Sequence, residues 1–294
     1  MSRSIAERQG FLKNWSRPQC RDEFEMTKGL IKIRMKGSNP SLPPVLFVPG
    51  SFSGAWIWKD NFLPFFHALG HEVAAMSFSG HGKTSLKDRL RGLEEFEKDL
   101  INVLSEFDSP PVVVAHSLGG LVAKRVATCV QMRALCLLSP IPDDGAARSV
   151  WKLFKKSPAS AFKLAAVAFE PRFTRLANAP VGIYSSKVNA TTQAQVTGRL
   201  QAESVRVLME SLKTRPRPLG QHDVPVHYWG AEGDHIIPAS EVERVARMNK
   251  APFKIMAGMS HTFQAEPNWD ELAADIVNWL AAIAASDSLH LKTN

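Results

Sequence analysis

The chain is poor in cysteine and has no long apolar run. Only three cysteines occur in 294 residues, Cys20, Cys129 and Cys136, and no two of them form a Cys-x-x-Cys pair. A disulfide framework needs an even number of more closely spaced cysteines. The sequence therefore favours a reducing compartment, and we expect a cytoplasmic protein. The apolar runs are interrupted within about ten residues, short of the roughly 20 that span a bilayer. The N-terminal residues also lack the apolar stretch of a secretory signal, so we expect neither a signal peptide nor a transmembrane segment.

Motifs for phosphate, nucleotide and metal binding are missing as well. The stretch Gly80-His81-Gly82-Lys83-Thr84 comes near a phosphate-binding P-loop, but the position that needs the first glycine is Ser77. His67 and His71 are four residues apart, but Gly70 interrupts them and no third ligand of a zinc site follows. The sequence therefore predicts no cofactor and no metal.

The basic excess is confined to one segment. The formal net charge is +8, and residues 141–220 contain 13 Lys and Arg but only 5 Asp and Glu. This leaves 23 of the 36 basic and 23 of the 28 acidic residues in the neutral remainder. Such a segment is either a solvated basic face or a surface that attracts an anionic substrate, an acyl carrier or a membrane. Its aromatic residues lie at helical spacing beside Leu and Ala, so we expect no nucleic-acid partner, and the oligomeric state stays open.

Short apolar segments alternate with helical patterns along most of the chain. Helical periodicity is clearest at 93–107, 119–130 and 272–280. The apolar segments are bounded by Gly or Pro and are apolar on both faces, which is typical of buried strands. They cover residues 30–35, 45–48, 73–78, 112–115, 134–138, 226–229 and 253–256. This order predicts an α/β fold with a mostly parallel central sheet and helices on both faces.

The alternation stops after Pro140 and resumes after a proline-rich connector that ends at Gly220. The intervening residues are helix-like but irregular, with aromatic residues among Lys and Arg. We therefore predict a polar extension at 1–24, a core formed by 25–140 and 221–294, and an inserted helical cap at 141–220.

A serine follows the fourth apolar segment at a turn into a helix. The residues Ala115-His116-Ser117-Leu118-Gly119 match the nucleophile-elbow pattern G-x-S-x-G, with alanine at the first small position. Small residues are needed there because the strand and the helix pass close together around the serine. The other interpretation is an ordinary turn in which Ser117 only caps the helix.

A serine hydroxyl is a weak nucleophile and needs a base that is oriented by an acid. Asp234 follows the segment 226–229, and His261 follows the segment 253–256. Functional loops gather at the carboxyl ends of parallel strands, so Ser117, Asp234 and His261 are expected to meet at one edge of the sheet. Ser117 is then the nucleophile, His261 the base and Asp234 the orienting acid.

Neighbouring residues offer alternatives for two of these roles. Glu232 and Asp144 are other candidate acids, since each lies in a loop just after a predicted strand. His235 adjoins Asp234 but lies in the acid's loop, so His261 is the better candidate for the base.

The predicted reaction also needs two donors to an oxyanion. One is the backbone N–H of Leu118, the residue after the nucleophile. The other comes from the loop after the second apolar segment, where we choose the Ser51 N–H. Phe52, Trp56 and His116 are expected to contribute to the substrate pocket.

Five stretches together resemble the α/β-hydrolase superfamily, in its order. They are VLFVPGSFSGAWIW, SFSGHGKTS, VVVAHSLGG, YWGAEGDHIIP and AGMSHTFQAEPNWDELAADIVNWL. The first stretch also resembles the His-Gly-x-x-x-Gly-x-Trp stretch of plant esterases and hydroxynitrile lyases, but this chain has Pro49 at the histidine position. The resemblance implies hydrolysis by a serine, unlike the haloalkane dehalogenases and epoxide hydrolases, which use aspartate.

We therefore expect a carboxylesterase-type hydrolase that cleaves a small-molecule ester or thioester through an acyl-enzyme on Ser117. An acyltransferase or thioesterase, and a hydrolase or lyase acting on a carbon–carbon bond, would use the same triad. A ligand-binding receptor with little turnover is the alternative from another class, because fold does not fix function.

Overall fold

The computed structural model describes residues 30–81, 90–169, 179–218 and 224–293. Within them, seven strands form one sheet in the order β1-β3-β2-β4-β5-β6-β7. The strands are β1 (Ile31–Met35), β2 (Val45–Val48), β3 (Val73–Met76), β4 (Val112–His116), β5 (Ala134–Leu138), β6 (Val226–Ala231) and β7 (Phe253–Met256). Only β1 pairs antiparallel, with β3, and all other neighbours are parallel. The predicted mostly parallel α/β sheet is confirmed.

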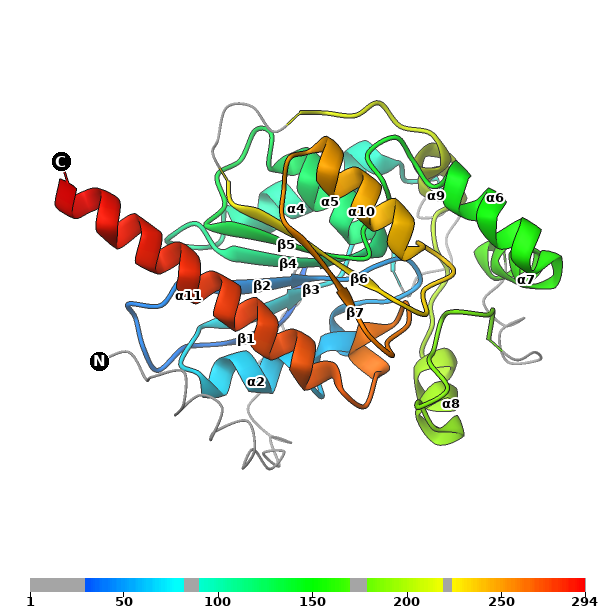
Figure 1. Cartoon of the computed structure of the whole chain (residues 1–294), viewed down its shortest axis with the longest axis horizontal. Helices are drawn as coiled ribbons and strands as arrows, with labels where there is room; N and C mark the ends of the chain where they lie inside the picture. The colour runs from blue at the N-terminus through cyan, green and yellow to red at the C-terminus, as the bar shows by residue number, and fades with distance from the viewer. Residues whose placement is uncertain (1–29, 82–89, 170–178, 219–223, 294) are drawn as a thin grey trace.

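Helices cover both faces of this sheet (Figure 1). On one face lie α4 (Leu93–Leu104), α5 (Ser117–Val126) and α10 (Ala239–Met248). On the other lie the short helix η1 (Ala55–Trp58), α2 (Phe62–Ala68) and α11 (Trp269–Thr293). Each layer encloses its own apolar cluster, because the side chains of a buried strand alternate between the two faces.

Edge strand β7 differs from the expected strand that is buried on both faces. Its burial pattern is half-exposed, with only Met256 fully buried. It pairs with β6 and, within the described residues, has no strand on its other side. Apolar content alone did not distinguish this edge from the interior strands.

Among the described residues of the chain between β5 and β6, four helices lie at one end of the sheet (Figure 1). They are α6 (Ala147–Lys156), α7 (Pro158–Phe169), α8 (Ala190–Gly198) and α9 (Val205–Leu212). Side-chain caps start two of them: Asn189 accepts from Thr192 N and Ser204 from Val207 N. We refer to these helices and the segments that join them as the cap. The cap boundaries at 141 and 220 stay a prediction. The polar extension at 1–24 also stays a prediction, because it lies outside the described residues.

Candidate active site

Ser117 lies where β4 turns directly into α5. Its φ is 52°, in the left-handed region that costs a non-glycine residue on the order of 1–3 kcal/mol. Gly119 permits the turn, because an added Cβ there would lie 2.3 Å from the carbonyl oxygen of Pro49. Ala115 is fully buried in β4, so the sheet accommodates the extra methyl group. The sharp turn predicted from the sequence is therefore present.

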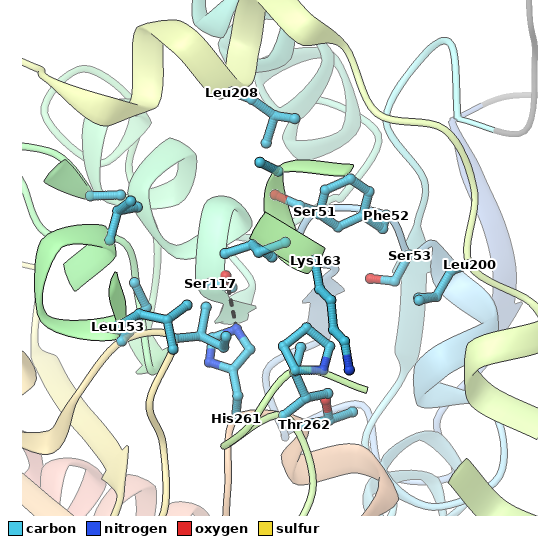
Figure 2. A pocket seen from close by; sticks show the side chains of 18 of the residues that line it. Ser51, Phe52, Ser53, Ser117, Leu153, Lys163, Leu200, Leu208, His261 and Thr262 are labelled. Atoms are coloured by element: carbon cyan, nitrogen blue, oxygen red, sulfur yellow. Dashed lines mark hydrogen bonds between the residues drawn. The ribbon is translucent and has the colours of Figure 1, made fainter. Parts of the chain in front are cut away.

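His261 lies between Ser117 and Asp234. Its Nε2 is 3.2 Å from Ser117 Oγ (Figure 2), and its Nδ1 is 2.8 Å from Asp234 Oδ2. Because a carboxylate oxygen accepts, Nδ1 carries the ring proton, and Nε2 is left to accept from the serine hydroxyl. All three residues are buried. The geometry is that of a nucleophile, a base and an orienting acid.

The Asp234 carboxylate is fixed by its own loop. Its Oδ1 accepts from the backbone N–H groups of Ile236, at 2.8 Å, and Ile237, at 2.9 Å. These bonds aim Oδ2 at His261 and satisfy the rest of a buried charge. A separate contact holds the base, since His261 N donates to the carbonyl oxygen of Gly182, in the cap.

The other candidate acids interact with residues outside the triad. Asp144 forms an ion pair with Arg244, at 2.8 Å. Glu232 Oε2 accepts from the backbone N–H of Gly258. Burial and the nearby Lys156 lower the pKa of His235, but its imidazole is not bonded to Ser117.

The loop from β2 to η1, residues 49–54, is held against the serine turn. An added Cβ at Gly50 would lie 2.9 Å from Ser117 Cβ. Phe52 has a φ of 63°, which is unusual for an aromatic residue. Two cap contacts fix it: Phe52 N donates to Glu203 Oε2, at 3.2 Å, and Gln201 N donates to Phe52 O, at 2.8 Å. The cap segment before α9 thus clamps the β2–η1 loop on both sides of Phe52.

His81, from the loop after β3, completes this clamp. Its Nδ1 is 2.6 Å from Ser53 O, and its Nε2 is 3.1 Å from Glu203 Oε1. Glu203 also accepts from two backbone N–H groups, those of Phe52, at 3.2 Å, and Ser204, at 2.9 Å. Burial lowers the pKa of His81, but Glu203 and the Ser53 carbonyl outweigh burial and leave it raised. Both ring nitrogens of His81 thus face acceptors, the Ser53 carbonyl and the Glu203 carboxylate.

The two predicted oxyanion donors lie beside the serine. Leu118 N is in the first turn of α5, where backbone N–H groups have no partner within the helix. Ser51 belongs to the clamped loop and lines the same cavity as Ser117. Within the described ranges, neither N–H donates a hydrogen bond to another residue. Both N–H groups are thus free of other partners there, and their role as oxyanion donors stays a prediction.

A cavity of about 550 Å³ opens above Ser117 and His261. Phe52 and His116 line it, as expected from the sequence. Trp56 is not among its lining residues: its ring lies under the Arg199 guanidinium, 4.5 Å away, and Ile57 lines the cavity instead. Most of the wall comes from aliphatic side chains of the cap, including Val150, Leu153, Ala161, Leu164, Leu200 and Leu208.

His116 connects the serine turn with the base. Its Nε2 donates to the main-chain carbonyl of His261, at 2.9 Å, and the two rings lie 4.7 Å apart. Burial, together with the neighbouring His261, holds the pKa of His116 well below 6.5. His116 is thus a neutral ring that supports His261.

Sequence reasoning missed three residues of this site. His81 and Glu203 form the clamp but are 122 positions apart, so no local spacing connects them. Lys163 of α7 also lines the cavity, and Figure 2 draws its side chain among those around Ser117 and His261. The excess of basic residues in the cap was the available signal for Lys163, but it could not single out one lysine.

A serine on a strand-to-helix turn, with Asp and His at the ends of later strands, is the architecture of the α/β hydrolases. The chain belongs to the alpha/beta hydrolase family, whose model matches residues 45–275. Within the described residues, no helix has the length and apolar character needed to cross a membrane.

Esterases are among the proteins that this chain is similar to. Methylesterase 9 of Arabidopsis thaliana is 38% identical over 85 residues, which are 28% of this chain and 33% of that protein. This chain thus matches only about a third of that relative's length. An esterase from Thermogutta terrifontis has a TM-score of 0.66 at 16% identity, covering 85% of this chain and 98% of that one. A carboxylesterase of Nitrososphaera gargenis has a TM-score of 0.64 at 15% identity, covering 90% and 99%. Identities this low show a shared fold.

Proposed function

We propose that the protein hydrolyses carboxylic esters of small, largely apolar molecules through an acyl-enzyme on Ser117. The observation that carries this proposal is the continuous chain of contacts from Ser117 Oγ to His261 and on to Asp234. The match to an esterase sequence and the likeness to esterase folds support the same chemistry.

In the first step, His261 Nε2 accepts the Ser117 proton while Oγ attacks the ester carbonyl carbon. Asp234 keeps the proton on Nδ1 and stabilises the imidazolium that forms. The carbonyl oxygen becomes an oxyanion, which the backbone N–H groups of Ser51 and Leu118 stabilise. His261 then donates its proton to the leaving alkoxide, so that an alcohol departs and the acyl group stays on Ser117.

The second step mirrors the first. His261 takes a proton from water, the resulting hydroxide attacks the acyl carbon, and the carboxylic acid leaves as Ser117 regains its proton. The clamp of Glu203 and His81 holds the donor loop in place throughout both steps. The aliphatic wall of the cavity favours an apolar acyl or alkyl group over a strongly polar one.

The direct test is the hydrolysis of p-nitrophenyl esters by the wild type and by Ser117→Ala, His261→Ala and Asp234→Asn. We expect kcat for Asp234→Asn to fall by about 10⁴-fold, because the wrong ring nitrogen is then protonated. His235→Ala is the matched control: its ring adjoins the triad but is not bonded to Ser117, so this variant should retain most activity. Full activity of Ser117→Ala would refute the proposal.

A further inference from the structure

Three aromatic side chains form an exposed ridge on the outer face of α6 and α7. Trp151, Phe154 and Phe162 are 57%, 39% and 70% exposed. The Trp151 and Phe154 rings are stacked, with centroids 5.8 Å apart and planes within 12°, and Phe162 meets Phe154 at 6.4 Å. Single exposed apolar residues are ordinary on a protein surface, but a contiguous aromatic group indicates an interaction site. We call these three residues the aromatic ridge.

The two helices that carry the ridge have an excess of positive charge. Residues 147–169, which form α6 and α7, contain no Asp or Glu. Their basic residues are Arg148, Lys152, Lys155, Lys156 and Lys163. Lys152 forms an ion pair with Glu241 of α10, whereas Lys155 lies with its Nζ 5.3 Å from the Trp151 ring centre. Lys155 and Lys156 are both exposed; Lys155 lies against the ridge, and Lys156 lies near enough to His235 to lower the pKa of that imidazole.

The same two helices wall the cavity with their other faces. Leu153 on α6, and Ala161 and Leu164 on α7, line the space above Ser117. The ridge residues alternate with these lining residues along the two helices. Helices α6 and α7 therefore carry the aromatic ridge on their exposed side and line the cavity with their other side.

We propose that the aromatic ridge, with Lys155 and Lys156, docks on the surface of an anionic lipid membrane. Aromatic rings enter the boundary between headgroups and acyl chains, and neighbouring lysines extend their ammonium groups to lipid phosphates. A second copy of this chain is a poorer occupant, because a two-fold interface would bring the two basic patches face to face. Docking would place the cavity wall at the membrane, where apolar esters accumulate, but it does not depend on the proposed hydrolysis.

The test is sedimentation of the full chain with vesicles of phosphatidylcholine alone and of phosphatidylcholine mixed with phosphatidylglycerol. We expect binding to the mixed vesicles, weakened by high salt, and little binding to phosphatidylcholine. Two double variants are compared with the wild type, and each should lower the partition coefficient by about tenfold or more. One carries Lys155→Gln and Lys156→Gln, and the other carries Trp151→Ala and Phe162→Ala. Met248→Ala and Lys98→Gln are the matched controls, since Met248 is 56% exposed on α10 and Lys98 is exposed on α4.

Thermal unfolding of each variant distinguishes a loss of vesicle binding from a loss of folding. If the variant with the two aromatic substitutions does not fold, the variant with the two lysine substitutions decides the test. The proposal is overturned if the wild type binds neither vesicle, if both ridge variants bind as the wild type does, or if neutral vesicles bind equally well. A dimer in solution that the aromatic substitutions dissociate would overturn it in favour of a second copy of the chain.

Discussion

The imidazole Nε2 of His81 lies 3.1 Å from Oε1 of Glu203, although 122 positions separate the two residues. Both side chains are buried, with exposures of 2% and 0%. Through this pair, the loop after β3 and the cap segment before α9 hold Phe52 and Ser53 from opposite sides. The backbone next to Ser51 is thus held by this buried histidine–glutamate pair, in addition to the bond from Ser53 Oγ to Gly50 O within the loop.

Removing the Glu203 carboxylate should impair catalysis more than substrate binding. Glu203→Ala leaves Phe52 N–H and His81 without their acceptor, so the loop should relax and the Ser51 N–H should move. We expect kcat to fall by about 10²-fold, as for loss of one oxyanion donor, with KM changed little. Glu203→Gln keeps an acceptor oxygen and should recover part of the loss. Steady-state kinetics on a p-nitrophenyl ester measure this, with Glu243→Gln, an exposed partner of Arg247, as the control. An equal loss of kcat in that control would contradict the account.

The same pair should make stability depend on pH. Burial lowers the pKa of His81, but Glu203, the Ser53 carbonyl and Asp99 together raise it by more than burial lowers it. The pKa of His81 in the folded state therefore lies above 6.5. A raised pKa adds stability that is complete below pH 6.5 and is lost as the pH rises through the folded-state value. The difference in free energy of unfolding between the wild type and His81→Gln should therefore shrink as the pH rises. Urea unfolding at several pH values measures it, and a difference that grows with pH would contradict the assignment.

Two glycines should respond oppositely to alanine. At Gly119 the added Cβ would lie 2.3 Å from Pro49 O, so Gly119→Ala should lower the free energy of unfolding by about 1–3 kcal/mol. At Gly198, the last residue of α8, an added Cβ would meet no atom of another part of the chain within 4 Å. Gly198→Ala should therefore leave the free energy of unfolding unchanged or raise it by up to about 1 kcal/mol. Urea denaturation compares the two variants. Equal effects would show that close packing at the serine turn is not what requires Gly119.

The cavity should select esters by size. Ala161 lines the cavity, whereas Ala159, on the same helix, is exposed. Ala161→Trp should lower kcat/KM for long acyl esters and leave acetate esters nearly unchanged, because each buried methylene contributes about 0.8 kcal/mol. Ala159→Trp is the control and should leave the chain-length profile as it is. A loss that is equal for all chain lengths would argue against this cavity as the acyl site.

Much of the fold could be predicted from the sequence because buried strands are short apolar runs. Such runs do not encode direction or position in the sheet, so the antiparallel pairing of β1 and the half-exposed edge at β7 were not foreseen. The third strand also ends at Met76, two residues before the predicted end at Phe78. Ser77 N still donates to Leu30 O, and Ser77 Oγ accepts from Ala55 N.

The site was predictable where chain order carries information. Ser117, Asp234 and His261 each follow a strand, and the ends of parallel strands meet, so their approach followed from order alone. The clamp did not follow, because the pairing of His81 with Glu203 depends on how the cap packs over the β2–η1 loop. Trp56 was misplaced for a related reason: the loop's sequence does not show which way η1 turns its side chains.

The most direct measurement of the central claim is labelling of the intact protein with a fluorophosphonate, followed by mass spectrometry of the modified peptide. The account predicts one phosphonylated residue, Ser117, with labelling lost in Ser117→Ala and strongly slowed in His261→Ala. Ser139, the buried serine at the end of β5, should stay unmodified. Labelling that persists in Ser117→Ala, or that maps to another serine, would contradict the assignment of Ser117 as the nucleophile.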